Sequence, residues 1–267
     1  MPRTSIALPL AGKRIVITRA QNQASGFHDG LAQLGAVVID LPTIEIKDPD
    51  SWRPLDSAIA CLEQFDFLIL TSVNGVRSFV NRLRACGRSP ADLAPLEVGA
   101  IGPATAEALR EATVRVDFIP QEYQAEGLLE SLNGREVRGK RFLIPRAKVA
   151  RDLVPRVLTG RGAQVEVVEA YQTVSPVYPP GEVKRRLTPR PDVLTFTSSS
   201  TAHHFVKLAQ QEGLLQEMEA CLMASIGPVT SATLKKLGLK VGVEARQSTI
   251  PGLEQALVEY FTASSTV

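Results

Sequence analysis

The chain repeats itself on the scale of a whole domain, and this repeat constrains the fold more than any other feature. Three pairs of segments carry it: GKRIVITRA (12–20) with GKRFLIPRA (139–147), DFLILTS (66–72) with DVLTFTS (192–198), and IGPAT (101–105) with IGPVT (226–230). The offsets of 125 to 127 residues are too long for a solenoid repeat and match the size of a domain. We therefore expect two similar domains with a ligand cleft between them, because domain interfaces often hold small ligands.

The composition is typical of a globular protein, with 44% hydrophobic and 22% charged residues. A net charge of +2 gives no strong field, so we expect neither nucleic acid nor a membrane surface as a partner. The three cysteines are far apart in the sequence, which is typical of a reducing compartment. Residues 1–12 lack the apolar stretch of a signal peptide, and no run approaches a membrane span. We expect a cytoplasmic protein.

Short apolar runs rich in β-branched residues alternate with segments whose apolar residues recur at helical spacing. The run 14–18 is followed by Phe27, Leu31 and Leu34 on one helical face, and Gly35 lies where a helix would end. This alternation predicts an α/β fold with two similar doubly wound parallel sheets. The predicted strands are 14–18, 36–39, 67–70, 98–101, 114–118, 142–144, 165–168, 193–196, 222–226 and 239–243.

Two segments break the alternation, 42–54 with three prolines and 174–191 with five. Such segments are typical of connections between domains. A cut at 133–138 would instead give two contiguous domains, and the repeat alone fits both divisions because either completes two equivalent sheets. The proline breaks favour a discontinuous division: domain 1 from 1–41 and 176–267, domain 2 from 46–172, and linkers 42–45 and 173–175.

Polar motifs of the repeat follow the predicted strands, at the edge where open parallel sheets bind ligands. Thr71 and Ser72 in the first copy match Thr197 and Ser198 in the second. Serine or threonine at this point is ordinarily a helix N-cap, so one instance alone would indicate a structural role. The occurrence of the pair in both copies favours a role in substrate binding.

Gly102 and Gly227 close the next strand in each copy, and a proline suited to the first helical turn follows each of them. Glycine lets backbone amides approach a ligand, and free amides at a helix N-terminus bind anions. Thr105 and Thr230 lie in that first turn, where their hydroxyls can reach the same anion. These four residues are candidate substrate-binding residues.

Arg19 and Arg146 follow equivalent strands, where an arginine either binds a substrate carboxylate or forms a surface salt bridge. Tyr171 lies where the second copy leaves its domain, and it either packs or offers a phenolic proton. The dinucleotide fingerprint, the phosphate loop, the serine elbow and the paired-histidine metal motif are all missing. If the chain is an enzyme, we expect it to act by binding and folding its substrate more than through a strong nucleophile or a metal, so no metal is expected.

Together these motifs resemble the uroporphyrinogen-III synthase family of tetrapyrrole biosynthesis. The resemblance covers residues 12–261 and includes AEGL at 125–128 and VEAYQT at 168–173. The family usually has proline where this chain has Ala20, Val73 and Ser199, which leaves the ligand contacts of those loops open.

The resemblance implies that the ends of the chain form one domain, joined to the other by a two-stranded linker. It also implies a lyase that closes linear hydroxymethylbilane into uroporphyrinogen III without a cofactor, losing water and inverting the last pyrrole ring. Tyr171 is then the candidate catalytic residue, and the strand-end loops hold the substrate carboxylates. We expect a monomer, and a transient contact with the preceding pathway enzyme stays open.

Two other functions remain open. Paired α/β domains also serve as non-catalytic binding modules, here for a tetrapyrrole-like molecule. A nucleotide-dependent transferase is disfavoured by the missing phosphate loop. The macrocycle that forms from hydroxymethylbilane separates all three functions.

Overall fold

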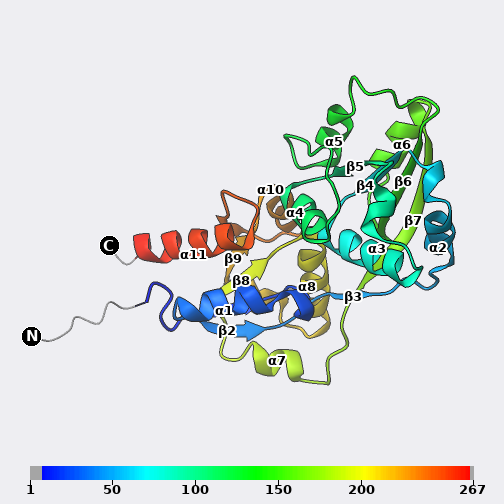
Figure 1. Ribbon diagram of the computed structural model, residues 1–267. Coiled ribbons are helices and arrows are strands. Elements are labelled where there is room, and N and C mark those ends of the chain that lie inside the picture. Colours follow the sequence, from blue (N-terminus) through cyan, green and yellow to red (C-terminus); the bar gives the residue numbers. More distant parts are fainter. Residues whose placement is uncertain (1–7, 265–267) are drawn as a thin grey trace, which may run out of the picture. The chain divides into compact units, whose positions relative to one another are not determined.

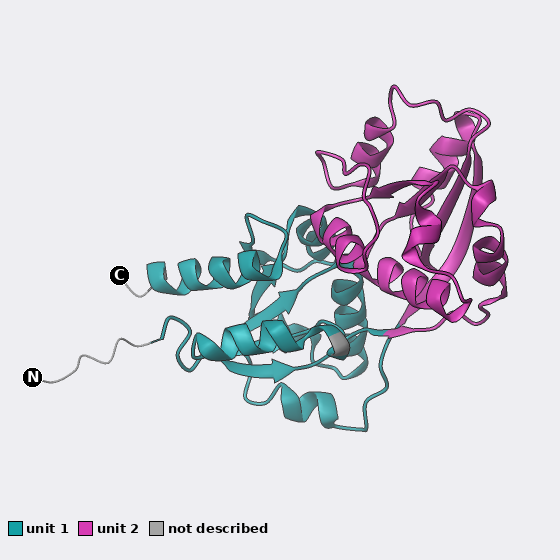
Figure 2. Cartoon of the chain, viewed as in Figure 1, with its two compact units in different colours: residues 1–45, 174–267 teal, residues 46–173 magenta. Residues whose placement is uncertain are grey.

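The computed structural model describes residues 8–264, so residues 1–7 and 265–267 of the predicted domain 1 lie outside the described part. The chain divides into two compact units (Figure 2). Unit 1 comprises 1–45 and 174–267, and unit 2 comprises 46–173. Each unit is built around its own sheet with helices packed against it (Figure 1).

Unit 1 has a five-stranded sheet in the order β10-β9-β8-β1-β2, in which every neighbouring pair is parallel. Its strands are β1 (Arg14–Ile17), β2 (Val37–Asp40), β8 (Val193–Phe196), β9 (Leu222–Ser225) and β10 (Val241–Glu244). Its helices are η1 (Gln21–Gln23), α1 (Ser25–Gln33), α7 (Glu182–Arg186), α8 (Ser199–Gln211), α9 (Leu215–Met218), α10 (Pro228–Lys236) and α11 (Ile250–Ser264).

Unit 2 has a five-stranded sheet in the order β3-β7-β6-β4-β5, and the pairs from β7 to β5 are parallel. Its strands are β3 (Glu45–Lys47), β4 (Phe67–Leu70), β5 (Glu97–Ala100), β6 (Arg141–Ala147) and β7 (Gln164–Val174). Its helices are α2 (Arg53–Ala60), η2 (Leu62–Gln64), α3 (Val73–Ala85), η3 (Pro90–Leu93), α4 (Pro103–Glu111), α5 (Ala125–Ser131) and α6 (Leu153–Gly160).

Each sheet combines strands from both copies of the repeat, and four strands follow equivalent orders: β9-β8-β1-β2 in unit 1 and β5-β4-β6-β7 in unit 2. β1 pairs with β8, and β6 pairs with β4, so in each sheet a strand of one copy lies beside a strand of the other. An aspartate from one copy bonds the first strand of the other copy at each junction. Asp192 Oδ2 accepts from the Arg14 N–H, and Asp66 Oδ2 accepts from the Arg141 N–H, both at 2.8 Å.

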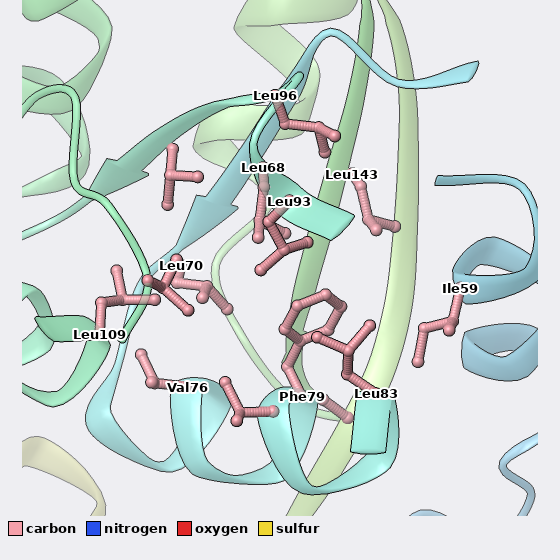
Figure 3. Packing of buried hydrophobic residues seen from close by; sticks show 14 of the residues in the cluster. Ile59, Leu68, Leu70, Val76, Phe79, Leu83, Leu93, Leu96, Leu109 and Leu143 are labelled. Atoms are coloured by element: carbon pink, nitrogen blue, oxygen red, sulfur yellow. The ribbon is translucent and has the colours of Figure 1, made fainter. Parts of the chain in front are cut away.

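Strand β4 shows how these sheets bury both faces. All four of its residues are buried, with Leu68 and Leu70 on one face and Phe67 and Ile69 on the other. The first pair packs with α2, α3 and α4 around the fully buried Phe79 (Figure 3), and the second packs with α5 and α6. Unit 1 has the same plan, with α8, α9 and α10 on one face and α1 and α11 on the other.

The strand predicted at 114–118 is absent, and only a bridge between Phe118 and Gly99 is found there. Asp117 gives the physical reason, because its Oδ2 accepts from the Val98 N–H at 2.8 Å. A side chain therefore takes a hydrogen bond that a regular ladder would make between backbones.

The proline-containing segments are more ordered than the sequence predicts. β3 lies within the first of them and α7 within the second. β7 extends to Val174, so two residues of the predicted linker 173–175 belong to a strand.

Candidate functional site

In each unit the predicted site residues lie at the carboxyl edge of the sheet, because parallel strands end on the same side. In unit 2 these residues are Thr71 and Ser72 after β4, Gly102 and Thr105 at the start of α4, and Arg146 and Tyr171 on β6 and β7. In unit 1 they are Arg19 after β1, Thr197 and Ser198 after β8, and Gly227 and Thr230 at the start of α10.

Tyr171 is a buried acidic group at the edge of unit 2, and it contacts a second predicted residue. It is 8% exposed, and its phenolic oxygen lies 3.0 Å from Ser72 Oγ. Burial raises the pKa of Tyr171 above its usual value of 10.0, and the hydrogen bond with Ser72 opposes this shift to a smaller extent. The phenol therefore keeps its proton across the neutral range.

Ser72 and Ser198 are both helix N-caps. Ser72 Oγ accepts from the Gly75 N–H at 3.0 Å, and Ser198 Oγ accepts from the Thr201 N–H at 3.2 Å. The structural role that the sequence left open is therefore present in both copies. Ser72 has a second bond, to the tyrosine, so its hydroxyl is engaged by the protein on two sides.

Helices α4 and α10 begin without a side-chain cap. Gly102 and Gly227 are their N-caps, and each glycine carbonyl accepts the first helical bond at 3.0 Å, from the amides of Ala106 and Ser231. The two amides between the proline and that bond have no partner within the helix. Amides of this kind are donors that can bind a carboxylate.

The hydroxyls of Thr105 and Thr230 lie beside those amides. The two side chains are 5% and 4% exposed, and neither hydroxyl bonds another residue of the described part of the chain. Neither oxygen is among the fully buried unpartnered atoms of residues 8–264, so each one reaches solvent. Both hydroxyls are available to a ligand.

The two arginines have protein partners. Arg19 Nε donates to Gln23 Oε1 at 3.2 Å. Arg146 is 14% exposed, and its guanidinium donates to the Arg151 carbonyl at 2.8 Å and forms an ion pair with Asp152. The salt-bridge role that the sequence left open for Arg146 is therefore observed.

Two residues that no sequence motif indicated pack on the strand-end glycines. A Cβ on Gly102 would lie 3.3 Å from Tyr123 Cβ, and one on Gly227 would collide with the Ser248 hydroxyl. Both glycines have extended backbones, with φ of −168° and 165°, so a preference for glycine there comes from the close approach and not from the backbone conformation. The offset of 125 residues that relates the glycines also relates Tyr123 to Ser248, and this signal could have identified them.

Within residues 8–264, no group of three or more His, Cys, Asp and Glu side chains is arranged to hold a metal ion. The helices of the same part of the chain are all too short or too polar to cross a membrane.

Comparison with known proteins gives one family. The family profile described as uroporphyrinogen-III synthase HemD matches residues 25–255. A uroporphyrinogen-III synthase of Synechococcus elongatus is 38% identical over 257 residues, covering 94% of this chain and 97% of that protein. A putative uroporphyrinogen-III synthase of Methanothermobacter thermautotrophicus is 31% identical, over 84% of this chain and 90% of that protein.

Solved structures share the fold. A mutant uroporphyrinogen III synthase of the extremely thermophilic bacterium Thermus thermophilus matches with a TM-score of 0.70 and 20% identity, covering 96% of this chain and 100% of that one. The synthase of Helicobacter pylori matches with a TM-score of 0.61, 20% identity and the same coverage. These matches confirm the predicted α/β fold class. Because the family profile spans most of the chain and a relative at 38% identity spans nearly all of it, this chain belongs to the uroporphyrinogen-III synthase family.

Proposed function

We propose that this chain is a uroporphyrinogen-III synthase of porphyrin biosynthesis. It is a lyase that closes linear hydroxymethylbilane into uroporphyrinogen III, losing water and inverting the last pyrrole ring. The observation that carries this proposal is the 38% identity to the Synechococcus elongatus synthase over 94% of the chain.

Substrate binding is assigned to both units. Hydroxymethylbilane carries carboxylates on every pyrrole ring, and the free amides at α4 and α10 are donors for such groups. The hydroxyls of Thr105 and Thr230 add a neutral hydrogen bond beside each pair of amides. Donors of this kind bind carboxylates without a bank of lysines, which is consistent with a net charge of only +2.

Tyr171 is assigned as the proton donor to the departing hydroxyl. Because the Gly75 N–H already donates to Ser72 Oγ, the Ser72 O–H can donate to the phenolic oxygen. The phenolic proton is then left for the substrate, which suits a general acid. The residue at the repeat offset of 127 from Tyr171 is Ile44, so the equivalent position of unit 1 carries no proton donor.

The steps balance with this single group. The C–O bond of the hydroxymethyl carbon breaks, the phenolic proton leaves with the hydroxide as water, and a cationic, N-protonated azafulvene forms beside the phenolate. The substituted α-carbon of the last ring attacks the azafulvene methylene and gives a spiro intermediate. The bond from this α-carbon to the bridge between the third and fourth rings then breaks, and the released bridge carbon is attacked by the opposite α-carbon of the last ring. The hydrogen lost from that carbon on closure restores the phenol. The protein accelerates the inverting attack by holding the reacting carbons close together.

The test is to give hydroxymethylbilane to the purified protein and to separate the porphyrin isomers after oxidation. The type III isomer should dominate and should form faster than spontaneous closure to type I. A non-catalytic tetrapyrrole-binding module would instead bind the substrate while only type I formed at the spontaneous rate. That outcome would overturn the proposed function.

We also propose that the protein acts as a monomer in the cytoplasm, with at most a transient contact with the enzyme that supplies its substrate. Neither the proposed substrate-binding residues nor the proposed proton donor needs a residue from a second copy of the chain. Sedimentation at micromolar concentration should give a mass near 28.9 kDa. A stable dimer would contradict it.

A further inference from the structure

Two equivalent loops, one in each unit, pass over the strand-end glycines. The Gln124 N–H donates to the Glu122 carbonyl at 2.8 Å, and the Thr249 N–H donates to the Gln247 carbonyl at 2.7 Å. The middle residue of each turn is the one that packs on the glycine. The repeat therefore builds the same backbone turn beside the free amides of α4 and of α10.

The side chain that packs on the glycine differs between the two turns. In unit 1 it is Ser248, which is small. In unit 2 it is Tyr123, whose Cβ, Cγ and Cδ1 would lie 3.3, 3.5 and 3.8 Å from a Cβ on Gly102. Tyr123 nevertheless stays 55% exposed, which is a large open surface for a tyrosine that packs against the backbone. Part of the side chain therefore faces Gly102, the N-cap of α4, while more than half of its surface is exposed.

We infer that Tyr123 is a specificity-determining residue, whose exposed ring packs against the pyrrole that has its carboxylate on the α4 amides. This inference rests on the proposed function. A pyrrole ring offers an aromatic face next to its acidic side chains, so an amide pair beside a tyrosine ring matches both parts. The four rings of the substrate are alike. An enzyme that inverts only one of them needs different contacts at the carboxyl edge of each of its two sheets. Tyr123 against Ser248 is such a difference.

The test measures KM, kcat and the ratio of type III to type I isomer for Tyr123→Ser, which places the residue of unit 1 in unit 2. We expect KM to rise roughly 2- to 12-fold, the range that corresponds to one aromatic contact, and the share of type I to increase. Tyr123→Phe keeps the ring and should behave as wild type. Tyr123→Leu keeps the packing on Gly102 without the aromatic face, and should fall between the two.

The matched control is Tyr260→Ser, which removes a 41% exposed tyrosine from α11 and should leave KM and the isomer ratio unchanged. Melting temperatures identify any variant that loses its fold. If Tyr123→Ser unfolds, Tyr123→Phe and Tyr123→Leu still test the inference. Wild-type KM and isomer ratio in a folded Tyr123→Ser or Tyr123→Leu protein would overturn the inference while leaving the proposed function intact. Failure of the wild-type protein to form type III would instead overturn the proposed function.

Discussion

Burial of Tyr171 raises the pKa of its phenol and so determines its protonation state. Its surroundings favour the neutral phenol, so the proton that the reaction needs is present at neutral pH. The hydrogen bond to Ser72 fixes the position of the phenolic oxygen. Position and protonation are therefore both set before substrate binds.

Tyr171→Phe should lower kcat by about 10²-fold, the lower end of what a general acid contributes, while the protein stays folded. Loss of the bond to Ser72 should cost about 0.5–1.5 kcal/mol of unfolding free energy. Tyr178→Phe is the matched control, because its hydroxyl donates to the Pro42 carbonyl in unit 1. Wild-type turnover in Tyr171→Phe would reduce this residue to a packing role.

Thr105→Ala and Thr230→Ala should each weaken substrate binding by about 0.5–1.5 kcal/mol, the value of one neutral hydrogen bond. Because both side chains are buried, loss of the methyl group should also lower the melting temperature slightly. Steady-state KM and thermal unfolding check both statements. Unchanged KM in both variants would remove the two threonines from the binding site.

At the residue scale the repeat located the strand-end loops but could not assign their side chains. Ser72 and Ser198 are both caps, and only the structure shows that Ser72 also meets Tyr171. The sequence separates Ser72 and Tyr171 by 99 residues, so no local pattern records their contact. Arg146 was likewise open until its bond to Asp152 appeared.

At the scale of elements, one aspartate stabilises each pair of strands that joins the two copies, β1 with β8 and β6 with β4. Asp66 bonds the Arg141 N–H and the Lys140 ammonium, and these contacts lower the pKa of its carboxyl below 3.8. Its side chain is 37% exposed, so solvent screens part of the effect. A carboxyl with a lowered pKa stabilises the fold above its unfolded pKa, and this stabilisation is lost as the pH falls through the folded value.

Asp66→Asn should therefore lower the unfolding free energy at pH 7 by about 1 kcal/mol, after allowance for screening. The difference from wild type should persist down to about pH 4 and shrink below it, because the charged form is then lost in both states. Urea titrations over this pH range measure it, with the exposed Asp29→Asn as control. A difference that stayed constant to pH 2 would show that charge is not the cause.

The element pattern was predictable where strands are short apolar runs, as in β4 and β8. It failed at 114–118, where Asp117 bonds the Val98 N–H and prevents a regular ladder. The apolar pattern also did not predict β3 and α7. Both are short, lie in proline-containing segments and depend on tertiary contacts. Apolar patterning does not record a side chain that competes for a backbone hydrogen bond.

On the scale of the whole molecule, the repeat could not choose between contiguous and exchanged domains. The proline breaks favoured the exchange, and the pairing of β1 with β8 agrees with it. Within residues 8–264, each unit contains two hydrophobic clusters built from its own residues. Stability should therefore be divided between the units.

The segment 46–173 should fold alone, because it is continuous and contains both clusters of unit 2. We expect cooperative unfolding of this fragment and dispersed amide resonances, but no formation of type III isomer, since α10 and its amides are missing. An unfolded fragment would show that unit 2 needs the other unit to fold.

The proposed inversion of a pyrrole ring breaks one carbon–carbon bond of the substrate, and an isotope experiment follows that bond. Hydroxymethylbilane is labelled with carbon-13 at the bridge between the third and fourth rings and at the fourth-ring carbon bonded to it. Inversion breaks the bond between the labels, so the one-bond coupling should disappear from the product formed by the purified protein. A product that retains the coupling would come from simple closure and would contradict the account.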